Sequence, residues 1–102
     1  MPVLYEQMTQ PAVLEEKVKR YENLLSKALS AFEVAPLEKS YLWKVANDFS
    51  NMAQAYYDDG KYFLEQGDTV NALACFSYGH AWLDAGVKLG VFKVSDENLF
   101  TI

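Results

Sequence analysis

Residues 69–89 constrain the fold more than any other part of the chain, because this stretch is almost free of charged side chains. Its only charged residues, Asp84 and Lys88, lie near its C-terminal end. Gly67 and Asp68 precede it, and these residue types are suited to end one helix and to cap the next. The sequence therefore predicts a helix over residues 69–89, tightly joined to the helix before it. A helix that is apolar on both sides is generally buried on both sides.

This expected helix has two different sides when its residues are placed at about 100° each. One side carries Phe76 and Leu83 together with Gly79 and Gly86, whose lack of a side chain lets a neighbouring helix pack closely. Gly60, in the preceding segment, is the expected counterpart across the joint. The far side consists of Ala74, Tyr78, Trp82 and Ala85.

Two amphipathic segments come before this helix, separated by Pro36. Their apolar residues follow alternating steps of three and four, which is the pattern of a helix that buries one stripe. The first stripe contains Leu14, Val18, Tyr21, Leu25, Ala28 and Phe32. The second contains Leu42, Val45, Phe49, Met52, Tyr56, Gly60 and Phe63, widened by Ala46, Ala53 and Leu64. We therefore expect helices over about residues 11–33 and 37–66.

These segments predict an all-α, up-and-down three-helix bundle in which the second and third helices are antiparallel neighbours. A chain of 102 residues is long enough for one core and one domain. Within that single domain, 1–102, the expected bundle covers 11–90. Residues 91–102 form a C-terminal extension that is unusually apolar for the end of a chain.

The composition excludes several classes of function. A net charge of −5 argues against a protein that binds nucleic acid by neutralising phosphates. The one cysteine, Cys75, cannot form an internal disulfide. The N-terminus lacks the features of a signal peptide, and no apolar run reaches the ~18 residues of a membrane span. We expect a cytoplasmic protein that has no cofactor and does not bind membranes.

The far side of the third helix raises the question of what covers Tyr78 and Trp82. A three-helix bundle buries about one side of each helix, so these aromatic residues need another cover. The extension 91–102 is one candidate, and a second copy of the protein or a different partner is the other. We favour the second copy, since aromatic side chains are common anchors at interfaces. Trp43 and Tyr62 are assigned to the same patch.

His80 and Asp84 are one helical turn apart and are weak candidates for a metal site. Asp58, Asp59 or Glu65 of the second helix would have to supply two further ligands. Asp58 and Glu65, however, lie on the polar side of that helix. The favoured interpretation is a structural hydrogen bond between histidine and aspartate, with no metal. Cys75 is interpreted as a small buried thiol in an apolar helix. The chain contains no catalytic motif that points to a nucleophile or a phosphate-binding loop.

Residues 58–92, DDGKYFLEQGDTVNALACFSYGHAWLDAGVKLGVF, resemble the signature region of a known family. The motif elements are Tyr-Phe-Leu-x-x-Gly-Asp at 62–68, Asn-Ala-Leu at 71–73 and Trp-Leu-Asp-Ala-Gly-x-x-Leu-Gly at 82–90. The family is the archaeal domain of unknown function 357, and the resemblance covers roughly residues 11–92. It implies a three-helix bundle from an archaeal cytoplasm and carries no catalytic residues to this chain.

The leading functional hypothesis is a non-enzymatic scaffold or interaction module that forms a homodimer through the apolar outer side of the third helix. One alternative is a metal-dependent or acid–base enzyme centred on His80 and Asp84. Another is a regulatory domain that docks onto an enzyme of nucleotide or RNA metabolism. The sequence does not decide between another protein and a second copy as the partner.

Overall fold

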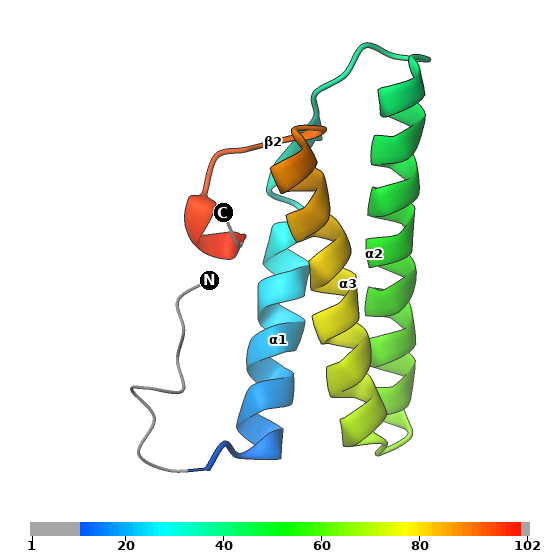
Figure 1. Ribbon diagram of the computed structural model, residues 1–102. Coiled ribbons are helices and arrows are strands. Elements are labelled where there is room, and N and C mark those ends of the chain that lie inside the picture. The colour runs from blue at the N-terminus through cyan, green and yellow to red at the C-terminus, as the bar shows by residue number, and fades with distance from the viewer. Residues whose placement is uncertain (1–10, 101–102) are drawn as a thin grey trace.

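The computed structural model describes residues 11–100, and three helices dominate it. These are α1 (Leu14–Ala28), α2 (Tyr41–Glu65) and α3 (Thr69–Leu89). The chain runs up through α1, down through α2 and up again through α3 (Figure 1). The expected up-and-down three-helix bundle is therefore confirmed. A short strand β1 (Phe32–Val34) follows α1, and strand β2 (Phe92–Val94) and the 3-10 helix η2 (Glu97–Leu99) follow α3.

The nearly uncharged α3 is the central helix of the bundle. It packs along α2 and along α1, whereas α1 and α2 meet over a much shorter stretch. The resulting molecule is thin, with principal dimensions of 45 × 33 × 16 Å. One side of α3 therefore faces the core and the opposite side faces outward. Despite its apolar character, neither α3 nor any other helix within residues 11–100 is long and apolar enough to cross a membrane.

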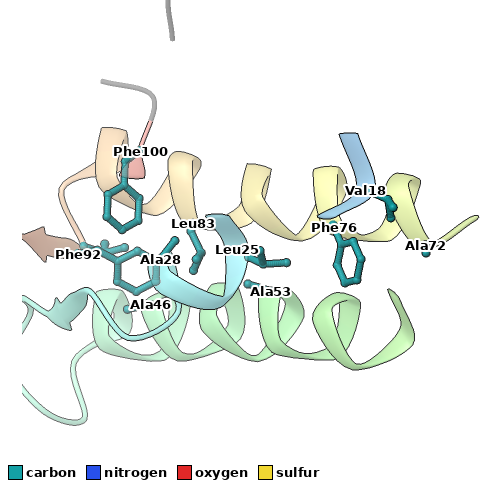
Figure 2. Packing of buried hydrophobic residues seen from close by; sticks show 11 residues of the cluster. Val18, Leu25, Ala28, Ala46, Ala53, Ala72, Phe76, Leu83, Phe92 and Phe100 are labelled. Atoms are coloured by element: carbon teal, nitrogen blue, oxygen red, sulfur yellow. The ribbon is translucent and has the colours of Figure 1, made fainter. Parts of the chain in front are cut away.

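The core is a row of buried apolar side chains between α2 and α3, covered by α1 (Figure 2). Phe76, Leu83 and Leu25 are completely buried. On α2 the buried positions are Ala46, Ala53 and Gly60, each seven residues after the last. Because these residues are small, α3 comes close to the α2 backbone and fills the space with its own larger side chains.

The larger residues of the expected α2 stripe lie beside this contact rather than in its centre. Leu42 and Met52 were expected in the core, but they are 48% and 37% exposed. Phe49 and Tyr56 are half-buried on the flank that faces α3. The alanines that were expected only to widen the stripe are its centre, because close helix approach favours the smallest side chains.

The start of α2 and the end of α1 differ from the sequence-based expectation. We expected α1 to continue to residue 33, but it ends at Ala28, and Phe32 belongs to β1. We expected α2 to begin near residue 37, but Lys39 has a left-handed φ of 67°, which a right-handed helix cannot contain. Ser40 then caps α2, since its hydroxyl oxygen accepts a hydrogen bond of 3.2 Å from the Trp43 N–H.

The strands β1 and β2 pair antiparallel and fix the C-terminal extension to the bundle. Phe32 lies opposite Val94 and Val34 lies opposite Phe92. The rings of Phe32 and Phe92 are 4.4 Å apart between centroids. Within the extension, Val91, Phe92 and Phe100 are at most 6% exposed, so these three residues form part of the core. Residues 101 and 102 of the expected extension, like residues 1–10, lie outside the described part of the chain.

The joint between α2 and α3 is made by Gly67 and Asp68. Gly67 adopts a left-handed φ of 75°, and the Asp68 N–H donates a 2.8 Å hydrogen bond to the Phe63 carbonyl. The Asp68 carboxylate accepts a 3.2 Å hydrogen bond from the Asn71 N–H and so caps α3. This arrangement turns the chain within the three residues 66–68 and makes α2 and α3 antiparallel.

Replacement of Gly86 by alanine tests the close packing of α3. A β-carbon at this position would overlap the ring of Phe92. We expect Gly86→Ala to lower the free energy of unfolding by about 1–3 kcal/mol, although alanine favours the helix by about 1 kcal/mol. Urea unfolding followed by circular dichroism measures the change. The control is Ala55→Ser at an exposed α2 position, with an expected effect within about 0.5 kcal/mol. Equal stability of Gly86→Ala and the unmodified protein would contradict this account.

Candidate functional site

His80 links α3 to the C-terminal extension through hydrogen bonds at both of its ring nitrogens. Nδ1 lies 3.1 Å from Oδ2 of Asp84, one turn further along α3. Nε2 lies 2.7 Å from the backbone oxygen of Leu99, just beyond β2 in η2. A carboxylate and a carbonyl can only accept, so both nitrogens donate a proton. This geometry selects the positively charged imidazolium form of His80.

The surroundings of His80 stabilise that charge. Burial lowers the pKa of His80, but the hydrogen bond to Asp84, the negative charge of Asp84 and the carbonyl of Leu99 raise it more. The net result is a pKa above the ordinary value of 6.5. The His80 and Asp84 side chains are 13% and 19% exposed, so bulk water weakens their attraction only in part.

A cavity of about 320 Å³ lies beside this pair, between α1 and α3. Its walls include Tyr21 and Leu24 from α1 and Phe76, Ser77 and Ala81 from α3, with His80 and Asp84 at one edge. The Phe100 ring lies 6.1 Å from the His80 ring between centroids and is buried. The site is therefore an apolar groove with one charged pair at its edge.

This arrangement offers little for metal binding. In residues 11–100, no three His, Cys, Asp or Glu side chains come together in a group that would hold a metal ion. Both nitrogens of His80 are already in hydrogen bonds, so a metal would have to displace Asp84 or Leu99. An acid–base role would likewise require Nε2 to leave the Leu99 carbonyl before it reached a substrate.

Tyr78 and Trp82 pack against aromatic residues of α2. The Tyr78 ring meets Tyr56 at 4.8 Å, and the Trp82 ring meets Phe49 at 5.2 Å, both edge to face. Trp82 is half-buried by this contact, while Tyr78 stays 56% exposed. The two aromatic residues assigned to one interface on α3 are therefore neighbours in the structure.

Trp43 and Tyr62, assigned to the same interface, lie near opposite ends of α2. They are separated by ~28 Å along the helix, given a rise of about 1.5 Å per residue. Trp43 is half-buried, and Tyr62 is 59% exposed with its ring against Phe63. A single partner would need to follow most of α2 to touch both.

We call the outward side of α3 its open face, and define it by five exposed residues. These are Ala74, Ser77, Tyr78, Ala81 and Ala85. A hollow of about 190 Å³ lies on this face, lined by Tyr78, Ala81, Trp82 and Ala85. The sequence pattern identified Ala74, Tyr78 and Ala85 of this face. It missed Ser77 and Ala81. Their positions at about 100° per residue would have placed them on the same side.

The three glycines expected at close contacts each face a larger group. A β-carbon on Gly60 would overlap the ring of Phe76, and one on Gly79 would lie 3.0 Å from both Leu25 and Tyr56. Gly86 meets Phe92 in the same way. The counterpart of Gly60 is thus an aromatic ring rather than another small residue.

The bundle also contains an ion pair between two helices and a free thiol. Lys61 of α2 and Glu22 of α1 form an ion pair of 3.0 Å, which the sequence did not reveal because the partners are on different helices. The hydrogen bond and charge of Glu22 raise the pKa of Lys61. Cys75 is a free thiol that is half-buried rather than buried as expected. Burial raises the pKa of Cys75, and the negative charges of Asp59 and Asp68 raise it further.

The fold and this site define a small all-helical bundle without a recognisable reaction centre among its described residues. The family model DUF357, described as a protein of unknown function, matches residues 20–92. The chain therefore belongs to the DUF357 family, as its motifs indicated.

A solved structure supports the same conclusion. The crystal structure of protein AF1782 from Archaeoglobus fulgidus, which is assigned to the same family model, is similar to this chain with a TM-score of 0.61. The two are 25% identical, and the similarity covers 82% of this chain and 100% of the other. No curated protein matches the chain.

The raised pKa of His80 predicts a dependence of stability on pH. The folded state binds this proton more tightly than the unfolded chain does. The contribution of protonated His80 to the free energy of unfolding is therefore fully present below pH 6.5. It is lost as the pH rises through the folded pKa. Urea unfolding at pH values from below 6.5 to above neutrality checks this decline. His80→Gln should flatten it, and a stability that rose with pH over this range would contradict the assignment.

Proposed function

We propose that the protein is a non-catalytic interaction module that binds a second copy of itself through the open face of α3. The observation that carries the proposal is the position of this face, directly opposite the core side of the central helix. Residues 69–83 contain no Asp, Glu, Lys or Arg, so the exposed side of α3 is mostly apolar and small. Such a surface loses little free energy of hydration when a partner removes it from water.

The shape of the open face supports a self-complementary contact. Tyr78 projects with 56% of its surface exposed, and the hollow beside Trp82 lies next to it. In a two-fold dimer, a projection on one copy meets a recess on the other, and the reverse contact forms by symmetry. Tyr78 of each copy is the expected anchor, and the alanines allow the two α3 helices to approach closely.

Charge also favours this face for contact between identical chains. Each copy carries a net charge of −5, so two copies repel one another wherever their acidic surfaces meet. The open face avoids that repulsion. The described part of the C-terminal extension leaves Tyr78 exposed, which supports a second copy as its cover in preference to the extension.

A cytoplasmic location is part of the same proposal. Cys75 is a free thiol with no cysteine partner in the sequence, which suits a reducing compartment.

Substitution at the open face tests self-association. We expect the protein to sediment as a dimer at tens of micromolar and Tyr78→Ala to weaken the dimer by about tenfold or more, as truncation of an aromatic anchor typically does. Trp82→Ala should act in the same direction, with circular dichroism used to confirm the fold, because Trp82 also contacts Phe49. Sedimentation velocity over a range of concentrations gives the dissociation constants.

The matched control is Tyr41→Ala. Tyr41 is 79% exposed at the start of α2, away from the open face, and its loss should leave the dimer unchanged. A monomer at tens of micromolar whose sedimentation does not respond to Tyr78→Ala would overturn the proposal.

A further inference from the structure

The C-terminal segment 95–100 packs against α1 through η2, and one hydrogen bond joins it to α3. The backbone hydrogen bonds of η2 are local. The Leu99 N–H donates to the backbone oxygen of Asp96, and the Phe100 N–H donates to the backbone oxygen of Glu97, each at 3.3 Å. Among the described residues, the hydrogen bond that connects this segment to a helix is the one from His80 Nε2 to the Leu99 oxygen, at 2.7 Å. Next to this hydrogen bond, the buried side chain of Phe100 packs into the hydrophobic core.

That hydrogen bond and the one to Asp84 can be made together only by the charged form of His80. Loss of one proton leaves a neutral imidazole with a single N–H, which cannot donate to both Asp84 and Leu99. The negative charge of Asp84 favours retention of the Nδ1 proton. Nε2 would then present a lone pair to the Leu99 carbonyl oxygen, and an attractive contact would become repulsive.

The charged groups around His80 determine where this change occurs. Asp84 faces it from α3, and η2 presents the Leu99 carbonyl, while Asp96 and Glu97 of the same segment are exposed to solvent. From α1, Tyr21 borders the same cavity. Two cations, Lys17 and Arg20, lie over the Tyr21 ring at 5.4 and 5.6 Å from its centroid. Asp84 is the closest charge, and its effect raises the pKa of His80 above 6.5 despite burial.

We infer that His80 is a proton-controlled clasp: when protonated it ties residues 95–100, which lie against α1, to α3, and when it gives its proton to solvent it loosens this hold. Release uncovers Phe100 and the side of α3 that carries His80, next to the open face. The surface of α3 that is available to a partner is therefore larger when His80 is neutral. The clasp is intramolecular and does not depend on dimer formation.

A titration of the full chain tests the clasp directly, because His80 is the one histidine in the sequence. Its ring signals in NMR spectra report its protonation without ambiguity. Amide hydrogen exchange of Leu99 and Phe100, corrected for the intrinsic effect of pH, measures how strongly the segment is protected against local opening. We expect His80 to titrate above 6.5, and the protection of these amides to fall by about tenfold at the same midpoint, the loss expected for a hydrogen bond to a charged group.

Three variants separate the clasp from a general loosening of the bundle. Asp84→Asn should move the His80 midpoint down, because the neighbouring negative charge is removed. His80→Gln should make the protection of the segment independent of pH. Glu97→Gln, which removes an exposed carboxylate from the same segment, should leave the midpoint where it is.

Two results would overturn the clasp. One is a His80 midpoint at or below 6.5 in the unmodified protein. The other is equal protection of Leu99 and Phe100 on both sides of the measured midpoint. Both are read from the unmodified protein, so a variant that fails to fold does not affect the decision. Neither depends on the oligomeric state, which distinguishes this test from that of self-association.

Discussion

The close approach of α2 and α3 is the constraint on which the rest of the structure depends. Gly60, Ala53 and Ala46 present a nearly flat surface, and Phe76 and Leu83 of α3 occupy the space that larger residues would fill. This contact fixes the position of α3, which in turn supports α1 on one side. Dispersion contacts and burial both stabilise this interface. A void or an overlap of even one methyl group would therefore lower the stability of the helix packing.

A central helix needs apolar residues on more than one side, and this explains the unusual composition of α3. Its inner side meets α2, and its flank with His80 meets α1 and the extension. Its open face is exposed to solvent, although Tyr78 also touches Tyr56 of α2. The extension folds back onto the bundle because Phe92 and Phe100 carry too much apolar surface to remain in water. The ion pair between Glu22 and Lys61 joins α1 to α2 where apolar contact between them is small.

Local signals predicted much of this fold, and long-range contacts account for the rest. The bounds of α3 and its joint follow from Gly67, Asp68 and the apolar run, which are all local. Phe32 matched the heptad pattern of α1 by spacing alone, but its position is decided by a strand more than half the chain away. The pairing of His80 with Asp84 was visible as one helical turn, whereas the Leu99 carbonyl is a backbone group whose position no side-chain pattern encodes.

The ribbon formed by β1 and β2 has a consequence for how the molecule is made. Phe32 is synthesised well before its partner Val94, which follows it by more than half of the described chain. Closing so long a loop carries an entropic cost that only the preassembled helices can offset. The helical hairpin of α2 and α3, whose contacts are closer in sequence, is therefore expected to form before the ribbon closes.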